Sequence, residues 1–170
     1  MRYPEWNELF APCYTPLEML EAGVFEGKYI NIIEGLPKSW YKLPTVVGPN
    51  DPPDVSLNKF GVKSRQPLSK WEDNGWIHTD AGGWFHWYCN YFLGRRLDIE
   101  DDHQIKRWRS FVARHQGQIV NAGCLRAKTK RIKQRQGLLQ WAWDSTRPFN
   151  ERTRANNLRR LQTLPQVKIK

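Results

Sequence analysis

Cysteine is scarce in this 170-residue sequence, which contains only Cys13, Cys89 and Cys124. The three residues are widely spaced, odd in number and form no C-x-x-C pair. A disulfide framework requires paired cysteines, and a structural zinc site requires closely spaced Cys or His ligands. We therefore expect no disulfide framework, no metal and no other cofactor, and we expect a reducing, cytoplasmic compartment.

Long apolar runs are also missing. The most apolar stretch, residues 82–94, is interrupted by His86 and Asn90 and is too short for a membrane-spanning helix, which needs about 20 apolar residues. The first residues, MRYPEWNELF, contain no apolar core of a secretory signal. The sequence therefore predicts an intracellular protein that does not associate with a membrane.

Acidic residues are nearly absent from the last quarter of the chain. Residues 126–170 contain 13 Lys and Arg against 2 Asp and Glu, whereas residues 1–58 contain 4 against 8. Residues 59–125 contain 10 against 7, so the formal net charge of +10 arises almost entirely from the C-terminal part. A basic segment of this kind attracts polyanions, and nucleic acid is the first candidate.

The densest basic run places six cations in ten residues without an intervening acid. Exposed helix faces usually mix both signs and form pairs four residues apart, which this run cannot do. Three interpretations are open: contact with nucleic acid or another polyanion, docking on the acidic N-terminal half, and plain solvation. We favour the first. It predicts phosphate contacts from Arg126, Lys128, Lys130, Arg131, Lys133 and Arg135.

A second group of candidate phosphate ligands comprises Arg95, Arg96, Lys106, Arg107 and Arg109. Arg95 and Arg96 follow the end of a predicted helix, where two guanidinium groups need anionic partners. An external anion is one such partner, and the acids within residues 98–102 are the internal alternative.

Aromatic residues are abundant, with 9 Trp, 6 Tyr and 7 Phe. The block over residues 75–96 places Trp84, Trp87, Tyr88 and Tyr91 at helical spacings of three and four. Such a stripe forms either a hydrophobic core or a platform on which bases stack. Because large aromatic side chains at helical spacing usually pack inward, we predict that most of these rings form the core.

Capping residues and apolar periodicity predict the helices. Thr15, followed by Pro16 and Glu18, is typical of a helix N-terminus. Asp98 and Asn150 are the expected N-caps of two later helices. The predicted helices begin at residue 16, cover 84–93, begin at 98, cover 130–143 and begin at 151. Residues 38–42 are expected to form a helical turn or an irregular segment and residues 47–56 a loop. A short helix from residue 69 and an extended stretch over 76–79 complete the prediction.

These elements predict a mainly α fold, with a single compact domain over residues 1–164. We expect four to five helices, long irregular loops, one of them at about residues 45–58, and an aromatic-rich core. Ile105, Trp108 and Val112 form the buried stripe of the clearest helix. Residues 165–170 are expected to form a basic tail.

The sequence contains no nucleophile elbow, P-loop, dinucleotide fingerprint or H-E-x-x-H motif. His78, Asp80 and His86 have donor types that suit a divalent metal, but their spacing matches no compact ligand pattern. We interpret them as structural or surface residues, with Asp80 as a candidate N-cap of the helix that follows. No catalytic residue is assigned.

Three motifs resemble a family of short uncharacterised proteins found in bacteriophages, bacteria, algae and fungi. They are PLEMLEAGVFEGKY at residues 16–29, GWFHWY at 83–88 with GRR at 94–96, and RQGLLQWAWDS at 135–145. The resemblance covers most of the chain and implies a soluble single-domain protein, encoded in this case by a phage. It implies no activity and no catalytic residue.

The charge distribution carries the functional hypothesis: a nucleic-acid-associated protein that binds DNA through its basic C-terminal region. One alternative is a small enzyme acting on a nucleotide or on a base in DNA. Its pocket would lie around residues 84–91, with Arg95 or Arg96 for phosphate and His78, Asp80 or His86 for proton transfer. The other alternative is an interaction protein that docks on an acidic partner.

Overall fold

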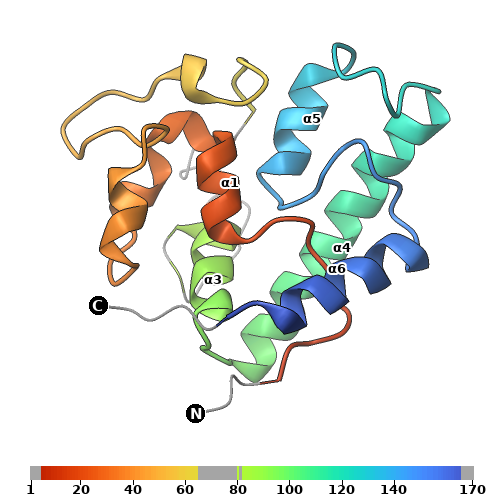
Figure 1. Cartoon of the computed structure of the whole chain (residues 1–170), viewed down its shortest axis with the longest axis horizontal. Coiled ribbons are helices and arrows are strands. Elements are labelled where there is room, and N and C mark those ends of the chain that lie inside the picture. Colours follow the sequence, from red (N-terminus) through yellow and green to blue (C-terminus); the bar gives the residue numbers. More distant parts are fainter. Residues whose placement is uncertain (1–4, 65–79, 81, 166–170) are drawn as a thin grey trace.

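The computed structural model describes residues 5–64, 80 and 82–165, and within these ranges the chain forms helices and loops but no strand (Figure 1). This result confirms the mainly α fold. The described α-helices are α1 (Pro16–Ala22), α3 (Gly83–Phe92), α4 (Asp98–Asn121), α5 (Ile132–Leu139) and α6 (Glu151–Thr163). Short 3-10 helices cover Phe25–Gly27, Tyr29–Ile32, Lys38–Lys42 and Val55–Leu57, and the third of them is the predicted helical turn.

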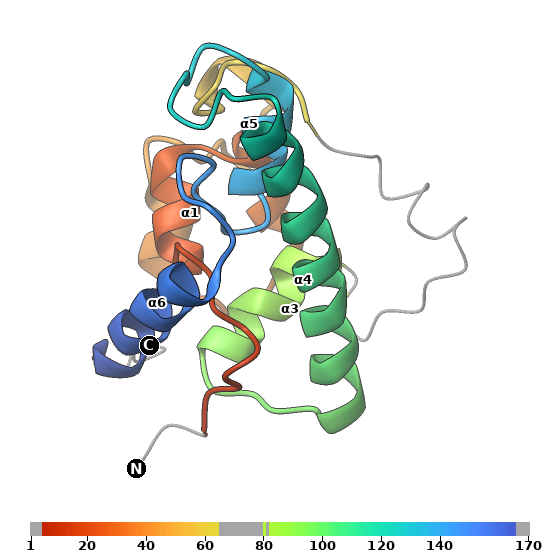
Figure 2. The same cartoon turned by 90° about the vertical axis from the view of Figure 1, so that its right-hand side faces the viewer.

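The longest helix, α4, is the axis along which the other elements are arranged. α3 lies beside its first half and α5 beside its last turns (Figure 2). The predicted stripe of Ile105, Trp108 and Val112 is buried and is continued by Ile119, so the spacing identified the packing face of this helix correctly. Neither α4 nor any other helix within the described ranges is long and apolar enough to cross a membrane.

The N-terminus of α4 corrects the prediction that Asp98 caps it. The helix already includes Asp98, and the N-cap residue is Leu97. The buried carboxylate of Asp101 accepts hydrogen bonds from the backbone N–H of Leu97 and from the indole Nε1–H of Trp87, both at 2.8 Å. Asp101, which also contacts Trp87 of α3, is therefore the acid that bonds to the backbone at the N-terminus of α4.

The core is aromatic, and Phe10 stands at its centre. Its ring lies 5.0–6.1 Å, between centroids, from the rings of Trp84, Trp87, Tyr88, Tyr91 and Trp108, mostly in edge-to-face geometry. Each such pair contributes about 0.5–1.5 kcal/mol beyond the burial of area. The α3 rings are buried, so the prediction of an aromatic-rich core is confirmed, and these rings are not an exposed stacking platform.

The start of α1 follows the predicted pattern. Thr15 and Glu18 form a reciprocal capping box, with Pro16 at the first helical position. The helix ends at Gly23, whose φ of 105° suits glycine, and a Cβ there would lie 2.0 Å from the carbonyl oxygen of Leu57. The close approach of these two backbones places the loop after residue 57 directly on the N-terminal part of the chain.

Helix α5 is shorter than the predicted span of 130–143. Arg131 and Ala142 adopt left-handed φ angles of 56° and 60°, which interrupt the helical path on both sides. Trp143 lies outside the helix but is buried, and its backbone N–H bonds to the carbonyl of Leu138 at 2.9 Å. The next helix, α6, begins as predicted, because the side chain of Asn150 accepts from the N–H of Thr153 at 2.9 Å. The short helix expected from residue 69 and the extended stretch over 76–79 lie outside the described residues.

Candidate nucleic-acid interface

The basic run lies on a turn-rich loop between α4 and α5 and on the first turn of α5 (Figure 1). The run is therefore not one continuous helix, and its first cations extend from a loop. Within the run, the exposed cations are Arg126, Lys128, Lys130, Arg131 and Lys133.

Arg135, the sixth predicted phosphate ligand, is fully buried. Its Nε donates to the carbonyl oxygen of Lys130 at 2.8 Å, and its Nη1 donates to Ser145 Oγ at 3.0 Å. Nη2 donates to the carbonyl oxygens of Cys124 and, at 3.2 Å, Ala127. An arginine offers five N–H donors in a fixed plane, which suits several carbonyl groups at once. Arg135 thus holds the backbone of the basic loop from inside, and its side chain is bonded to acceptors of the protein itself.

A second loop joins this surface from the other side of α5. The hydroxyl of Ser64 donates to the carbonyl oxygen of Lys133 at 2.8 Å, and the N–H of Phe60 donates to Gln136 Oε1 at 3.1 Å. These bonds hold residues 59–64 against α5 (Figure 2) and bring the exposed Lys59 and Lys63 beside it. We define the basic surface as Lys59, Lys63, Arg126, Lys128, Lys130, Arg131 and Lys133.

The two chain segments that carry the basic surface contain no acidic residue. Neither residues 59–64 nor residues 122–143 contain an Asp or Glu. Within the described part of the chain, none of the seven cations of the basic surface forms an ion pair. The alternative in which the run docks on the acidic N-terminal half therefore finds no supporting ion pair among the described residues.

The second group of candidates lies mostly near the opposite end of α4, and its side chains have intramolecular partners. Arg95 forms an ion pair with Asp80, with Nη1 2.8 Å from Oδ1. The Arg96 guanidinium stacks 3.6 Å from the ring centroid of Tyr91 and donates to its carbonyl oxygen at 2.6 Å. The remaining contacts are those of Lys106 with Asp102 at 3.0 Å, Arg107 with Gln104 at 3.0 Å and Arg109 with the carbonyl oxygen of Leu9 at 3.1 Å.

Asp80 was a candidate N-cap of α3, but the N-cap residue is Gly82. Burial raises the pKa of Asp80, yet its hydrogen bonds and charge interaction with Arg95 outweigh burial and hold the pKa below its usual value. Asn90 adds a hydrogen bond to the same carboxylate at 3.1 Å. Asp80 therefore acts as an internal anionic partner of Arg95, whereas the sequence had left an external anion and the acids of residues 98–102 as the alternatives.

The predicted metal candidates do not assemble in the described part of the molecule. His86 Nδ1 accepts from the N–H of Gly82 at 3.0 Å, and its Nε2 lies 3.7 Å from Asp80. His78 lies outside the described residues. Among the residues that the structure describes, no group of three or more His, Cys, Asp or Glu side chains is arranged to hold a metal ion.

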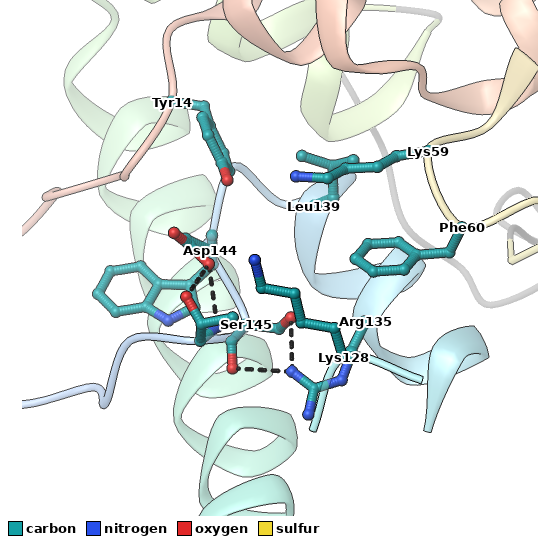
Figure 3. Close-up of a pocket in the computed structure, with 10 residues that line it drawn as sticks. Tyr14, Lys59, Phe60, Lys128, Arg135, Leu139, Asp144 and Ser145 are labelled. Carbon is teal, nitrogen blue, oxygen red and sulfur yellow. Dashed lines mark hydrogen bonds between the residues drawn. The ribbon is translucent and has the colours of Figure 1, made fainter. Parts of the chain in front are cut away.

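A small pocket of about 80 Å³ opens within the basic surface. Figure 3 shows the side chains of Lys59 and Lys128 pointing toward the same space as the hydroxyl of Tyr14. Asp144 and Ser145 form part of the wall. The sequence gives no signal for this pocket, because its residues come from three distant segments and no local motif connects them.

No protein-family model, curated protein or solved structure shows a significant match to this chain.

Proposed function

We propose that the protein binds nucleic acid, with DNA as the expected partner, through the basic surface. The observation that carries the proposal is the set of seven exposed cations on two adjoining loops and α5, without an ion pair among the described residues. When such side chains bind phosphates, the counterions condensed on the nucleic acid are released, and this release favours binding.

The shape of the surface favours contacts with the phosphate backbone. The backbone of the loop over residues 122–131 is held by the buried guanidinium of Arg135, so the positions from which its cations extend are fixed before binding. Holding the ligating groups in place lowers the entropy cost of association. The aromatic rings of α3 are interior, so base stacking on them does not support the proposal. We therefore expect binding with little sequence preference.

The test measures dissociation constants for duplex DNA, single-stranded DNA and RNA by fluorescence anisotropy at several salt concentrations. If five of the cations contact phosphates, the logarithm of the binding constant should fall with the logarithm of salt with a slope of about −4.5 on duplex DNA. Replacing three cations together, Lys130→Gln, Arg131→Gln and Lys133→Gln, should reduce the slope by about 3.

A matched control removes three charges elsewhere, with Lys38→Gln, Lys42→Gln and Arg152→Gln. All three side chains are exposed and lie outside the basic surface. The control should keep the slope of the parent protein. Binding that is absent, insensitive to salt or equally weakened by both triple variants would contradict the proposal. Equal affinity for polyglutamate would show instead that the surface recognises an acidic protein.

A further inference from the structure

The pocket within the basic surface is large enough for a single functional group and too small for a whole nucleotide. Sites that enclose drug-sized ligands have volumes of about 300–1,000 Å³, whereas this pocket has about 80 Å³. A whole nucleotide does not fit such a space, but it admits several water molecules and hence a tetrahedral group of similar bulk. An internal phosphate, with a sugar on each side, would remain at the mouth, whereas a terminal phosphate can project inward.

The walls of the pocket are rich in hydrogen-bond donors. Lys59 and Lys128 supply two ammonium groups from separate loops (Figure 3). The hydroxyl of Tyr14 has no acceptor among the described residues. Burial and the charge of Asp144 raise the pKa of Tyr14, so this hydroxyl keeps its proton at neutral pH. Ser145 Oγ accepts from Arg135 and still has its own proton to donate.

Among the described residues of the wall, Asp144 supplies a carboxylate, and this group already has partners. Its Oδ1 accepts from the N–H and the hydroxyl of Thr146, at 2.9 and 2.7 Å. Its Oδ2 lies 3.7 Å from Arg147 Nε. The other charged groups among the described lining residues, Lys59, Lys128 and Arg135, are all positive. An anion therefore meets an excess of positive charge and of unused donors.

We propose that this pocket binds a phosphate monoester, presented by the 5′ end of a nucleic-acid strand whose internal phosphates lie on the basic surface. The assignment rests on the function proposed above. A monoester carries a charge of about −1.5 to −2 at pH 7, against −1 for an internal phosphate, and so it gains more from paired ammonium groups. A free mononucleotide offers the same group without the strand, and the experiment separates the two sources.

The experiment compares two oligonucleotides of one sequence, labelled at the 3′ end, one with a 5′-phosphate and one with a 5′-hydroxyl group. Hydrogen bonds to a charged group should make the phosphorylated strand bind about tenfold more tightly. Lys59→Gln should abolish this difference. Tyr14→Phe, which keeps the ring, should reduce it two- to threefold. Lys63→Gln, on the same loop but outside the pocket, should weaken both strands equally and preserve the difference.

The outcomes separate the two proposals. Equal affinity for the two strands, with normal salt dependence, overturns the pocket assignment and leaves the proposed function in place. If neither strand binds, the proposed function fails, and the pocket is then judged by titration with a 5′-mononucleotide and with inorganic phosphate, followed by NMR. Signals of Tyr14 that shift in the parent protein but not in Lys59→Gln support a phosphate site for free ligands. An absence of shifts overturns the pocket as well.

Discussion

The two ends of α4 use basic residues in opposite ways. At the α3 end, Arg95 is paired with Asp80, and Arg96 lies against Tyr91. At the α5 end, five cations of the run remain exposed while Arg135 alone is buried. A count of Lys and Arg in the sequence does not distinguish these situations. The comparison shows that the fold engages some basic residues in internal ion pairs and carbonyl contacts, whereas the cations of the basic surface lie exposed without an ion pair among the described residues.

The largest effect should come from the buried arginine at the α5 end. Arg135→Met should reduce the free energy of unfolding by about 3–5 kcal/mol, because it leaves several buried carbonyl groups without a donor. Arg135→Lys should recover little of this loss, since an ammonium group cannot reach the same carbonyl groups in one plane. Urea denaturation measures the effect.

Lys133→Met, an exposed substitution on the same helix, is the control for Arg135 and should change the stability by less than about 0.5 kcal/mol. A loss below about 1 kcal/mol for Arg135→Met would show that the guanidinium does not hold the loop together, and the contrast between the two ends would then weaken.

An intermediate effect is expected at the α3 end, where Asp80→Asn removes the charge that faces Arg95. The free energy of unfolding at pH 7 should fall by about 2 kcal/mol, since the carboxylate of Asp80 is buried and bonded to a charged donor. The pKa of Asp80 is lowered by folding, so its contribution is present above the unfolded value of about 3.9 and is lost as the pH falls below it.

The difference between the parent protein and Asp80→Asn should therefore shrink from pH 7 toward pH 3 in urea denaturation. Asp102→Asn serves as the control, because the exposed pair of Asp102 with Lys106 contributes little at either pH. If Asp80→Asn lowers the free energy of unfolding equally at both pH values, the ion pair with Arg95 does not account for the loss.

The smallest effect should follow from Arg96→Gln. The stacked guanidinium on Tyr91 contributes about 1 kcal/mol or less at this half-exposed position, and the loss is measured by thermal or urea denaturation. Arg96→Gln should also change the salt dependence of DNA binding less than Lys130→Gln, a single substitution on the basic surface, does. An equal or larger change in the slope would place a phosphate contact at the α3 end and remove the contrast.

Local patterns in the sequence predicted a large part of the fold. The capping residues at positions 15 and 150, the buried stripe of α4 and the aromatic face of α3 all show in spacings of a few residues along the chain. Such spacings follow from helical geometry alone. The two N-cap predictions, Asp98 for α4 and Asp80 for α3, were wrong for a similar reason. The carboxylate at the start of α4 that is bonded is Asp101, which Trp87 of α3 contacts, and the carboxylate of Asp80 is bonded to Arg95.

The candidate site was predicted only in part. The sequence located the exposed cations between residues 126 and 133 because they are consecutive and lack acidic neighbours. It did not identify Lys59, Lys63 or Tyr14, which join the site through hydrogen bonds and packing between segments far apart in the chain. Residues of this kind carry no spacing signal in a single sequence.

The scarcity of acidic residues in the last quarter, the lack of long apolar runs and the helical spacing of the aromatic residues are set by the sequence itself. They determine that the charge is segregated and that the interior is built from large rings. The tertiary structure decided which of the described cations are buried or paired with an acid. Arg135 turned inward because carbonyl groups from two loops converge around it, and Arg95 was neutralised by Asp80. These choices depend on long-range packing, which brings partners together regardless of their distance in the chain.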